Sequence, residues 1–65
     1  MLPEWRALRL RCVTLRQPRD GWPVGTKGTI IEAFEDAALL EISDHEGVTL
    51  AMLTLPYAAL AIAGS

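Results

Sequence analysis

The sequence has one cysteine and one histidine, and this scarcity limits the chemistry that the chain can perform. Cys12 alone cannot form an internal disulfide or a thiolate metal site. We interpret it as a small apolar residue on a buried strand face rather than as a reactive thiol. His45 has no second histidine or cysteine with which to complete a zinc site. The sequence therefore predicts a protein that is not an enzyme, with no catalytic residues, no metal site and no cofactor.

Long hydrophobic runs are also lacking. The longest weakly polar run, residues 48–63, contains Pro56 and is too short to cross a bilayer. The N-terminus alternates charged and apolar residues and has no apolar stretch typical of a signal peptide. A lone cysteine fits a reducing compartment. We therefore expect a soluble, cytoplasmic protein that does not contact a membrane.

Lysine and arginine are absent from the second part of the chain. Residues 1–27 hold all six basic residues against two acidic ones, a net charge of +4. Residues 28–65 hold six acidic residues and no basic one, a net charge of −6. Such an asymmetry indicates either a dipolar binding surface or charge pairing between neighbouring strands. We favour charge pairing between strands.

Apolar residues are abundant, at 51% of the 65 residues. A chain of this length forms one domain and buries only about 60% of the surface that its unfolded form exposes. Some leucine, alanine and isoleucine side chains must therefore lie on the surface, where a patch of them can meet a partner. Small domains also gain stability by association. We expect the chain to bind another protein or a second copy of itself.

Closely spaced turn residues divide the chain into short segments rich in β-branched and apolar residues. We expect strands over residues 10–16, 27–35, 38–43, 48–54 and 60–63. Val13 and Leu15 are expected to point inward in the first strand, and Leu40 and Ile42 in the third. Gly28 indicates a bulge or a close backbone approach. Pro56 breaks the fourth strand, and a single 3₁₀ turn is expected before the last strand.

A long loop, residues 17–26, separates the first two expected strands, and its turn residues are Pro18, Asp20, Gly21, Pro23 and Gly25. The long first loop, the tight hairpins and the 3₁₀ turn before the final strand are the order of an SH3-like barrel. We predict an all-β fold: a small SH3-like barrel of about five strands. It forms a single domain over residues 1–65, in which residues 1–9 are either a brief helical segment or a loose lead-in.

Four arrangements invite a chemical interpretation, and each has a simpler one. Asp44, His45 and Glu46 are consecutive on a tight turn, so they rarely point at one centre, and we interpret His45 as solvated. In a pair of Cys12 with His45, nothing orients the imidazole. The segment GTKG at residues 25–28 lacks the spacing of a phosphate-binding loop. Acidic residues on adjacent strands are typical of a solvated face.

Binding is the function that the sequence favours. The candidate partner-binding residues are Trp22, Val24, Trp5, Arg19 and Lys27. Trp22 is either a docking residue or a lid over the small core. The alternative is an RNA-associated barrel, since basic residues alternate with tryptophans in the first half of the chain. The acidic second half and the isoelectric point of about 5.1 disfavour binding to a polyanion. We therefore consider nucleic acid a less favoured partner than protein.

Three segments resemble a family of short bacterial proteins known as a domain of unknown function. They read VGTKGTIIE at residues 24–32, LEI at 40–42 and GVTLAMLTLP at 47–56. Family members commonly read GxxGTIVE, (Y/L)EVEF and GxTLALLTL, and TLAMLTLP is the most specific part because GTKGTII is shared by many SH3-like and KOW-type barrels. The resemblance spans residues 10–62, and residues 1–9 depart from it. It implies a small β-barrel from the bacterial cytosol with no assigned activity. It also favours the view that the chain neutralises another protein, as an antitoxin or an immunity protein does.

Overall fold

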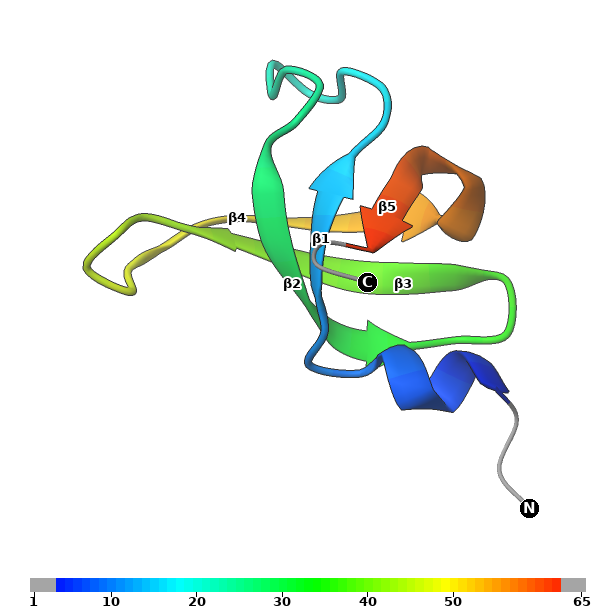
Figure 1. Ribbon diagram of the computed structural model, residues 1–65. Coiled ribbons are helices and arrows are strands. Elements are labelled where there is room, and N and C mark those ends of the chain that lie inside the picture. The colour runs from blue at the N-terminus through cyan, green and yellow to red at the C-terminus, as the bar shows by residue number, and fades with distance from the viewer. Residues whose placement is uncertain (1–3, 63–65) are drawn as a thin grey trace.

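The computed structural model describes residues 4–62, which form five strands and two short 3₁₀ helices (Figure 1). In chain order the elements are η1 (Glu4–Leu8), β1 (Cys12–Leu15), β2 (Lys27–Ala33), β3 (Ala37–Ser43), β4 (Thr49–Pro56), η2 (Tyr57–Ala59) and β5 (Leu60–Ile62). Within this part of the chain, neither helix has the length and apolar character needed to span a bilayer.

The five strands form one antiparallel sheet in the order β4-β3-β2-β1-β5. β1 lies between β2 and β5, so that Val13 stands opposite Gly28 on one side and Ile62 on the other. In Figure 1 the β3–β4 hairpin runs across the direction of β1 and β2, because the sheet is strongly bent. This order, with a long loop after β1 and η2 before β5, is that of an SH3-like barrel. The predicted all-β fold is confirmed.

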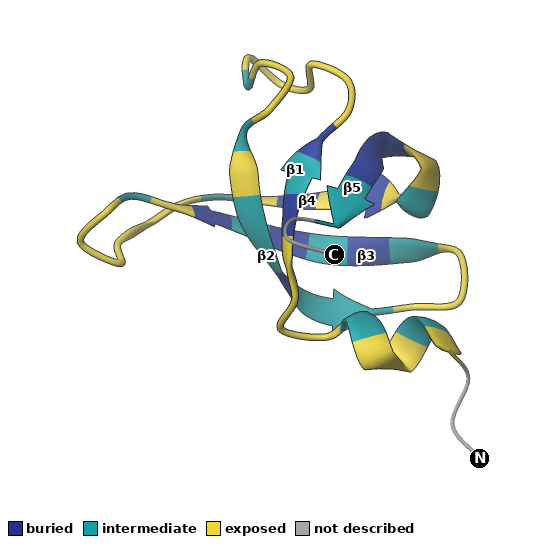
Figure 2. Cartoon of the chain, in the orientation of Figure 1, coloured by how far each residue is buried: buried dark blue, intermediate teal, exposed yellow. Residues whose placement is uncertain are grey.

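The core lies on the inner face of the bent sheet (Figure 2). It consists of Val13, Leu15, Ile30, Ala38, Leu40, Ile42, Leu53, Leu55, Ala59 and Leu60. β3 alternates between buried and partly exposed residues along its length, as expected for a strand with one face on the core. The inward orientation predicted for Val13, Leu15, Leu40 and Ile42 is confirmed.

Gly28 allows β2 to pass close to β3. A Cβ atom at this position would lie 2.8 Å from both Cγ and Cδ1 of Leu40 and 3.0 Å from the backbone oxygen of Glu41. The close approach predicted at Gly28 is therefore confirmed. The irregularity in the β2–β3 register lies further along β2, between Ile30 and Glu32, where the strand bends.

Cys12 is exposed, so its predicted place on a buried strand face is wrong. The cause is the alternation of β1. Val13 and Leu15 fill the core, and their larger side chains turn Cys12 to the outer face. The strand also begins two residues later than predicted, because Leu10 adopts a φ of 67° and leaves the extended conformation.

The two 3₁₀ helices lie before the first strand and between the last two strands. η1 takes the helical alternative predicted for the lead-in, and Leu8 packs against the core, while residues 1–3 lie outside the described part. η2 follows β4, which ends at Pro56 and not at residue 54 as predicted. Pro56 still pairs with Ala37, because the last residue of a strand tolerates a missing N–H. The hydroxyl of Tyr57 donates a hydrogen bond to the backbone oxygen of Phe34 and ties η2 to the β2–β3 turn.

Candidate interaction surface

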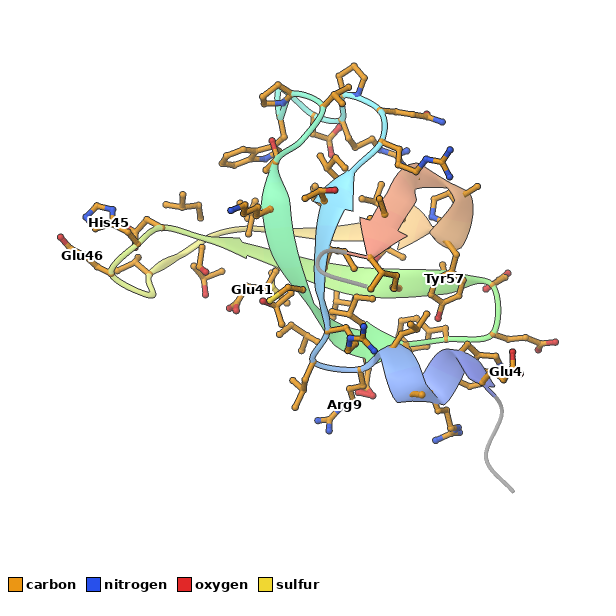
Figure 3. All side chains as sticks on the ribbon, viewed as in Figure 1. Glu4, Arg9, Glu41, His45, Glu46 and Tyr57 are labelled. Carbon is orange, nitrogen blue, oxygen red and sulfur yellow. The ribbon has the colours of Figure 1, made fainter. Side chains whose placement is uncertain are left out.

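The β3–β4 hairpin ends in a turn that its own side chains hold. Asp44 Oδ1 accepts hydrogen bonds from the backbone N–H of Glu46 at 2.9 Å and of Val48 at 3.0 Å. Gly47 has a φ of 85°, which glycine adopts without strain. His45 lies at the tip of this turn with 91% of its side chain exposed, and its Nε2 is 3.7 Å from Glu46 Oε1 (Figure 3). The turn is a solvated loop end that fixes the start of β4.

Histidine, cysteine and carboxylate groups are dispersed over the described residues, and no three of them are placed to hold a metal ion. His45 lies at the hairpin tip (Figure 3), whereas Cys12 is exposed at the start of β1. The structure records no hydrogen bond between these two residues. The Cys12 thiol and the His45 imidazole are therefore not placed as a nucleophile and its base in one site.

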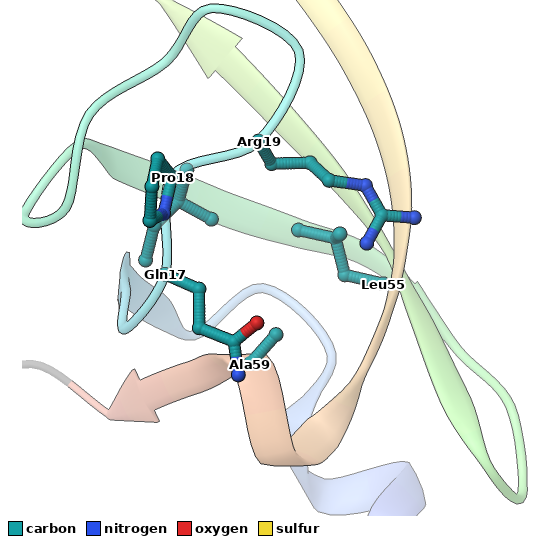
Figure 4. Close-up of a pocket in the computed structure, with 6 residues that line it drawn as sticks. Gln17, Pro18, Arg19, Leu55 and Ala59 are labelled. Carbon is teal, nitrogen blue, oxygen red and sulfur yellow. The ribbon is translucent and has the colours of Figure 1, made fainter.

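A small pocket lies where the β1–β2 loop packs against β4 and η2 (Figure 4). Its lining residues are Leu15, Gln17, Pro18, Arg19, Leu55 and Ala59. The volume open to water is about 10 Å³, which is room for a single water molecule. Small-molecule sites are usually several hundred Å³ in size, so this pocket is too small for a cofactor or a metabolite. It does place the Arg19 guanidinium beside Leu55 of β4 (Figure 4).

Four of the five predicted partner-binding residues lie at one end of the molecule. Trp22 is half-buried and packs against the core, and its backbone exchanges hydrogen bonds with Arg19 at 2.7 and 2.9 Å. Val24 is 60% exposed, and Lys27 is exposed at the start of β2. Trp22 therefore has the packing expected of a lid, and Val24 is the apolar side chain that this loop presents to solvent.

Trp5 lies at the opposite end of the molecule from that loop. η1, which carries it, is at the bottom of Figure 1, and the β1–β2 loop is at the top. The Arg6 guanidinium stacks 4.9 Å from the centre of the Trp5 ring, a cation–π contact. The five predicted residues thus do not form one continuous surface.

The basic residues are likewise divided between the two ends. Arg6 and Arg9 lie at η1, while Arg16 and Arg19 lie at the β1–β2 loop. Arg9 donates a hydrogen bond to the backbone oxygen of Ile31 at 3.2 Å and forms an ion pair with Glu32 at 3.7 Å. Among the described residues this is the one recorded ion pair between the basic and acidic parts of the chain. The expected charge pairing between the two parts therefore occurs at one place, and the basic groups form no single stripe for a polyanion.

The most concentrated exposed apolar surface lies on and beside β4. Val48, Leu50 and Met52 have exposed fractions of 54%, 52% and 48%. Met52 stands opposite Glu41 on the outer face of the β3–β4 pair. On the other face of the same strand, Leu53 and Leu55 are buried in the core. We call Val48, Leu50 and Met52 the β4 strip.

The sequence contains a signal for the β4 strip. The run from 48 to 63 has no charged residue, although its first part is predicted as a strand. A strand with apolar residues at both odd and even positions exceeds what one core face can bury. One set must then face solvent or a partner. That argument singles out this strand from the sequence, but only the structure shows which of the two sets is exposed.

The comparisons with known proteins identify no relative. No protein family model matches the chain, and neither a curated protein nor a solved structure matches it. The functional interpretation therefore starts from the geometry of the described residues.

Proposed function

We propose that the protein is a non-catalytic interaction module that binds another protein in the cytoplasm, in the manner of an antitoxin or an immunity protein. The observation that carries this proposal is the β4 strip, three large apolar side chains about half exposed on and beside an uncharged strand of a very small domain. Exposed apolar patches with a polar surround mark interaction sites. The resemblance to short bacterial proteins supports the same class of interaction module.

The surroundings of the strip favour a basic partner. Glu41 lies opposite Met52, and the turn beside Val48 carries Asp44 and Glu46. An apolar strip with a carboxylate rim complements a surface that places lysine and arginine around an apolar patch. A protein whose own active site binds a polyanion has such a surface, which is why an inhibitor of a nuclease-type toxin fits this geometry.

An affinity pull-down of the tagged chain from its own host, with and without nuclease, tests the proposal. The variant Leu50→Lys places a charge in the strip, and Leu10→Lys is the control, because Leu10 is also more than half exposed but lies between η1 and β1. We expect one stoichiometric protein that survives nuclease, is retained by Leu10→Lys and is lost with Leu50→Lys. Recovery that collapses on nuclease treatment would instead support the RNA-associated alternative and overturn the proposal.

A further inference from the structure

β4 is an edge strand, and the β1–β2 loop reaches it only near Leu55. It pairs with β3 on one side, and no other strand among residues 4–62 pairs with its second side. The strand spans Thr49–Pro56 and contains no charged residue. Natural edge strands are usually short, or they carry lysine, a bulge or proline that discourages pairing with another chain. β4 has a bulge at Leu50 and Pro56 at its end, and the segment between them is unprotected.

The direction of the backbone groups along the sheet follows from the hydrogen bonds of Ile30. Its N–H donates a hydrogen bond to the backbone oxygen of Arg11 at 3.0 Å, and its oxygen accepts one from the backbone N–H of Leu10 at 2.5 Å. Both backbone groups of Ile30 therefore face the β1 side. Leu40 stands directly opposite Ile30 on β3. In an antiparallel pair, residues that do not bond each other both turn their groups outward. Leu40 therefore turns its N–H and C=O toward β4.

The same alternation identifies the free groups of β4. Leu53 stands opposite Leu40 and exchanges backbone hydrogen bonds with it. Successive residues of a strand turn their groups to opposite sides, so Met52 and Thr54 direct theirs away from β3. These two residues lie between the bulge at Leu50 and the proline at the end of the strand. They form a short template for one more antiparallel strand.

We propose that two copies of the chain associate by antiparallel pairing of their β4 strands about a two-fold axis at Leu53. Met52 then stands opposite the partner's Thr54, and Thr54 opposite the partner's Met52. Each pair exchanges two backbone hydrogen bonds, which satisfies the groups that β4 leaves free. Leu50 falls opposite the partner's Pro56, whose missing N–H costs nothing at a position where the strand is already bulged.

A second copy fits this edge because the strand is uncharged. Two-fold pairing brings equivalent residues close together, so a charged strand would repel itself. β4 has no such residue, and the pairing joins the two β4 strips into one apolar surface across the axis. The outer-face contacts are Met52 with the partner's Thr54 and Leu50 with the partner's Pro56, and the second of these pairs two apolar side chains.

The charges at the two ends of the strand are complementary in this arrangement. The register carries the turn with Asp44 and Glu46 past the end of the partner's β4. At that end Arg19 lies beside Leu55 (Figure 4), and the N–H of Arg16 donates to Ala59 at 2.8 Å. The acidic turn of each copy thus meets the basic loop of the other.

Acidic groups also lie at that end of the sheet, on the side away from the axis. Glu35 and Asp36 belong to the β2–β3 turn. They lie near the end of β4, because the next residue, Ala37, is the first of β3 and pairs with Pro56. The attraction is therefore partial, and we expect the dimer to weaken with salt without dissociating completely.

The dimer uses the same strand that the proposed function assigns to a partner protein. Self-association would then cover the strip until a partner displaces the second copy. Only the competition rests on the proposed function, because the dimer is a property of the purified chain. If the purified protein is monomeric while the pull-down retains a partner through β4, this inference fails and the proposed function stands. If the purified protein is a dimer and the pull-down captures no partner, this inference stands and the proposed function fails.

Sedimentation equilibrium of the purified chain tests the association. Pairing of one strand buries less surface than a standard interface, so we expect a dissociation constant in the micromolar range, measured from about 1 µM to about 1 mM protein. Met52→Lys should raise this constant at least about tenfold, because it places lysines beside the axis in both copies. Leu10→Lys should leave it unchanged, because Leu10 is exposed between η1 and β1, away from the β4 edge. Circular dichroism checks that both variants fold.

Cysteine crosslinking tests the register. In a Cys12→Ser background, the double variant Met52→Cys/Thr54→Cys should form a covalent dimer on mild oxidation, because directly opposed residues lie within disulfide reach. Each single variant should crosslink much less, since its cysteine then has only a diagonal neighbour. A chain that is monomeric at every concentration overturns the proposal. A dimer that Met52→Lys does not weaken, or that crosslinks equally through the single variants, overturns the β4 pairing or its register.

Discussion

The sheet has two edges, and they differ in length. β4 runs for eight residues, whereas β5 has three within the described residues 4–62 and follows directly from η2. A three-residue edge offers little to a foreign strand, and shortness is one of the ordinary protections of an edge. β4 lacks that protection and carries exposed apolar side chains. The comparison teaches that one sheet can be closed to association at one edge and open at the other.

The largest expected effect separates the two faces of the open edge. Leu55→Ala removes a side chain that is 1% exposed and should lower the free energy of unfolding by about 3 kcal/mol. Met52→Ala, on the outer face of the same strand, should change it by less than about 0.5 kcal/mol in the monomer. Urea denaturation at low protein concentration measures both. Equal losses would show that the strip belongs to the core and would contradict its assignment as a free surface.

The next effect concerns the bend that separates the two edges. Gly28→Ala would place a Cβ atom 2.8 Å from Cδ1 of Leu40, inside van der Waals contact. Either the Leu40 side chain must shift or the strands must move apart, at a cost of about 2 kcal/mol. Thermal unfolding should show a lower midpoint than for Gly21→Ala, a control in which glycine has open space around it but a φ of 86°. A larger loss in the control would mean that backbone conformation outweighs packing in this domain.

The start of the open edge depends on Asp44. Asp44→Ala removes the acceptor for the N–H groups of Glu46 and Val48. Because both groups are exposed and water can replace the carboxylate, the loss in stability should be about 1 kcal/mol or less. Faster amide exchange at these two residues, with unchanged exchange in β1, is the expected NMR result. Asp44→Asn keeps the acceptor oxygen and should restore the protection.

The smallest effect concerns η2, which connects the two edges. Burial, and then the negative charge of Asp36, raise the pKa of Tyr57 above its ordinary value of 10.0, while the hydrogen bond to Phe34 lowers it. A raised pKa means that the folded state holds the proton more tightly than the unfolded state. The resulting stability is present below pH 10 and is lost as the pH rises through the folded pKa.

Tyr57→Phe should therefore remove the part of the alkaline loss of stability that Tyr57 causes. At neutral pH it removes one hydrogen bond, at a cost of about 0.5 kcal/mol, since the hydroxyl is near solvent. Stability measured at intervals from neutral to alkaline pH compares the two proteins. An identical alkaline decline in both would show that other groups control it.

The strands and the core were predictable from the sequence because local patterns determine them. Turn residues lie between the strands, and alternation predicted Val13, Leu15, Leu40 and Ile42 as core residues. The boundaries failed where a single backbone angle decides them, as at Leu10 with its φ of 67°. Periodicity carries no information about such an angle. Cys12 was misplaced because residue type was given more weight than its position next to Val13.

The candidate site was less predictable, because it depends on which strand is left at the edge. Trp22 and Val24 were singled out for their residue types, yet Trp22 packs against the core and only Val24 is strongly exposed. Whether Met52 is covered depends on the order of strands in the sheet, and this order follows from pairings between distant residues. Composition showed an excess of apolar residues but not their location.

The order of strands also has a consequence for how the chain reaches its fold. β3 and β4 are neighbours in sequence and form a local hairpin, whereas β1 gains its second neighbour only when Val13 meets Ile62 at the far end of the chain. Contacts so distant along the chain form slowly, so the hairpin is expected to exist before the five-stranded sheet is complete. During that interval β4 exposes both its core face and its open edge. The yield of refolding should consequently fall as the protein concentration rises.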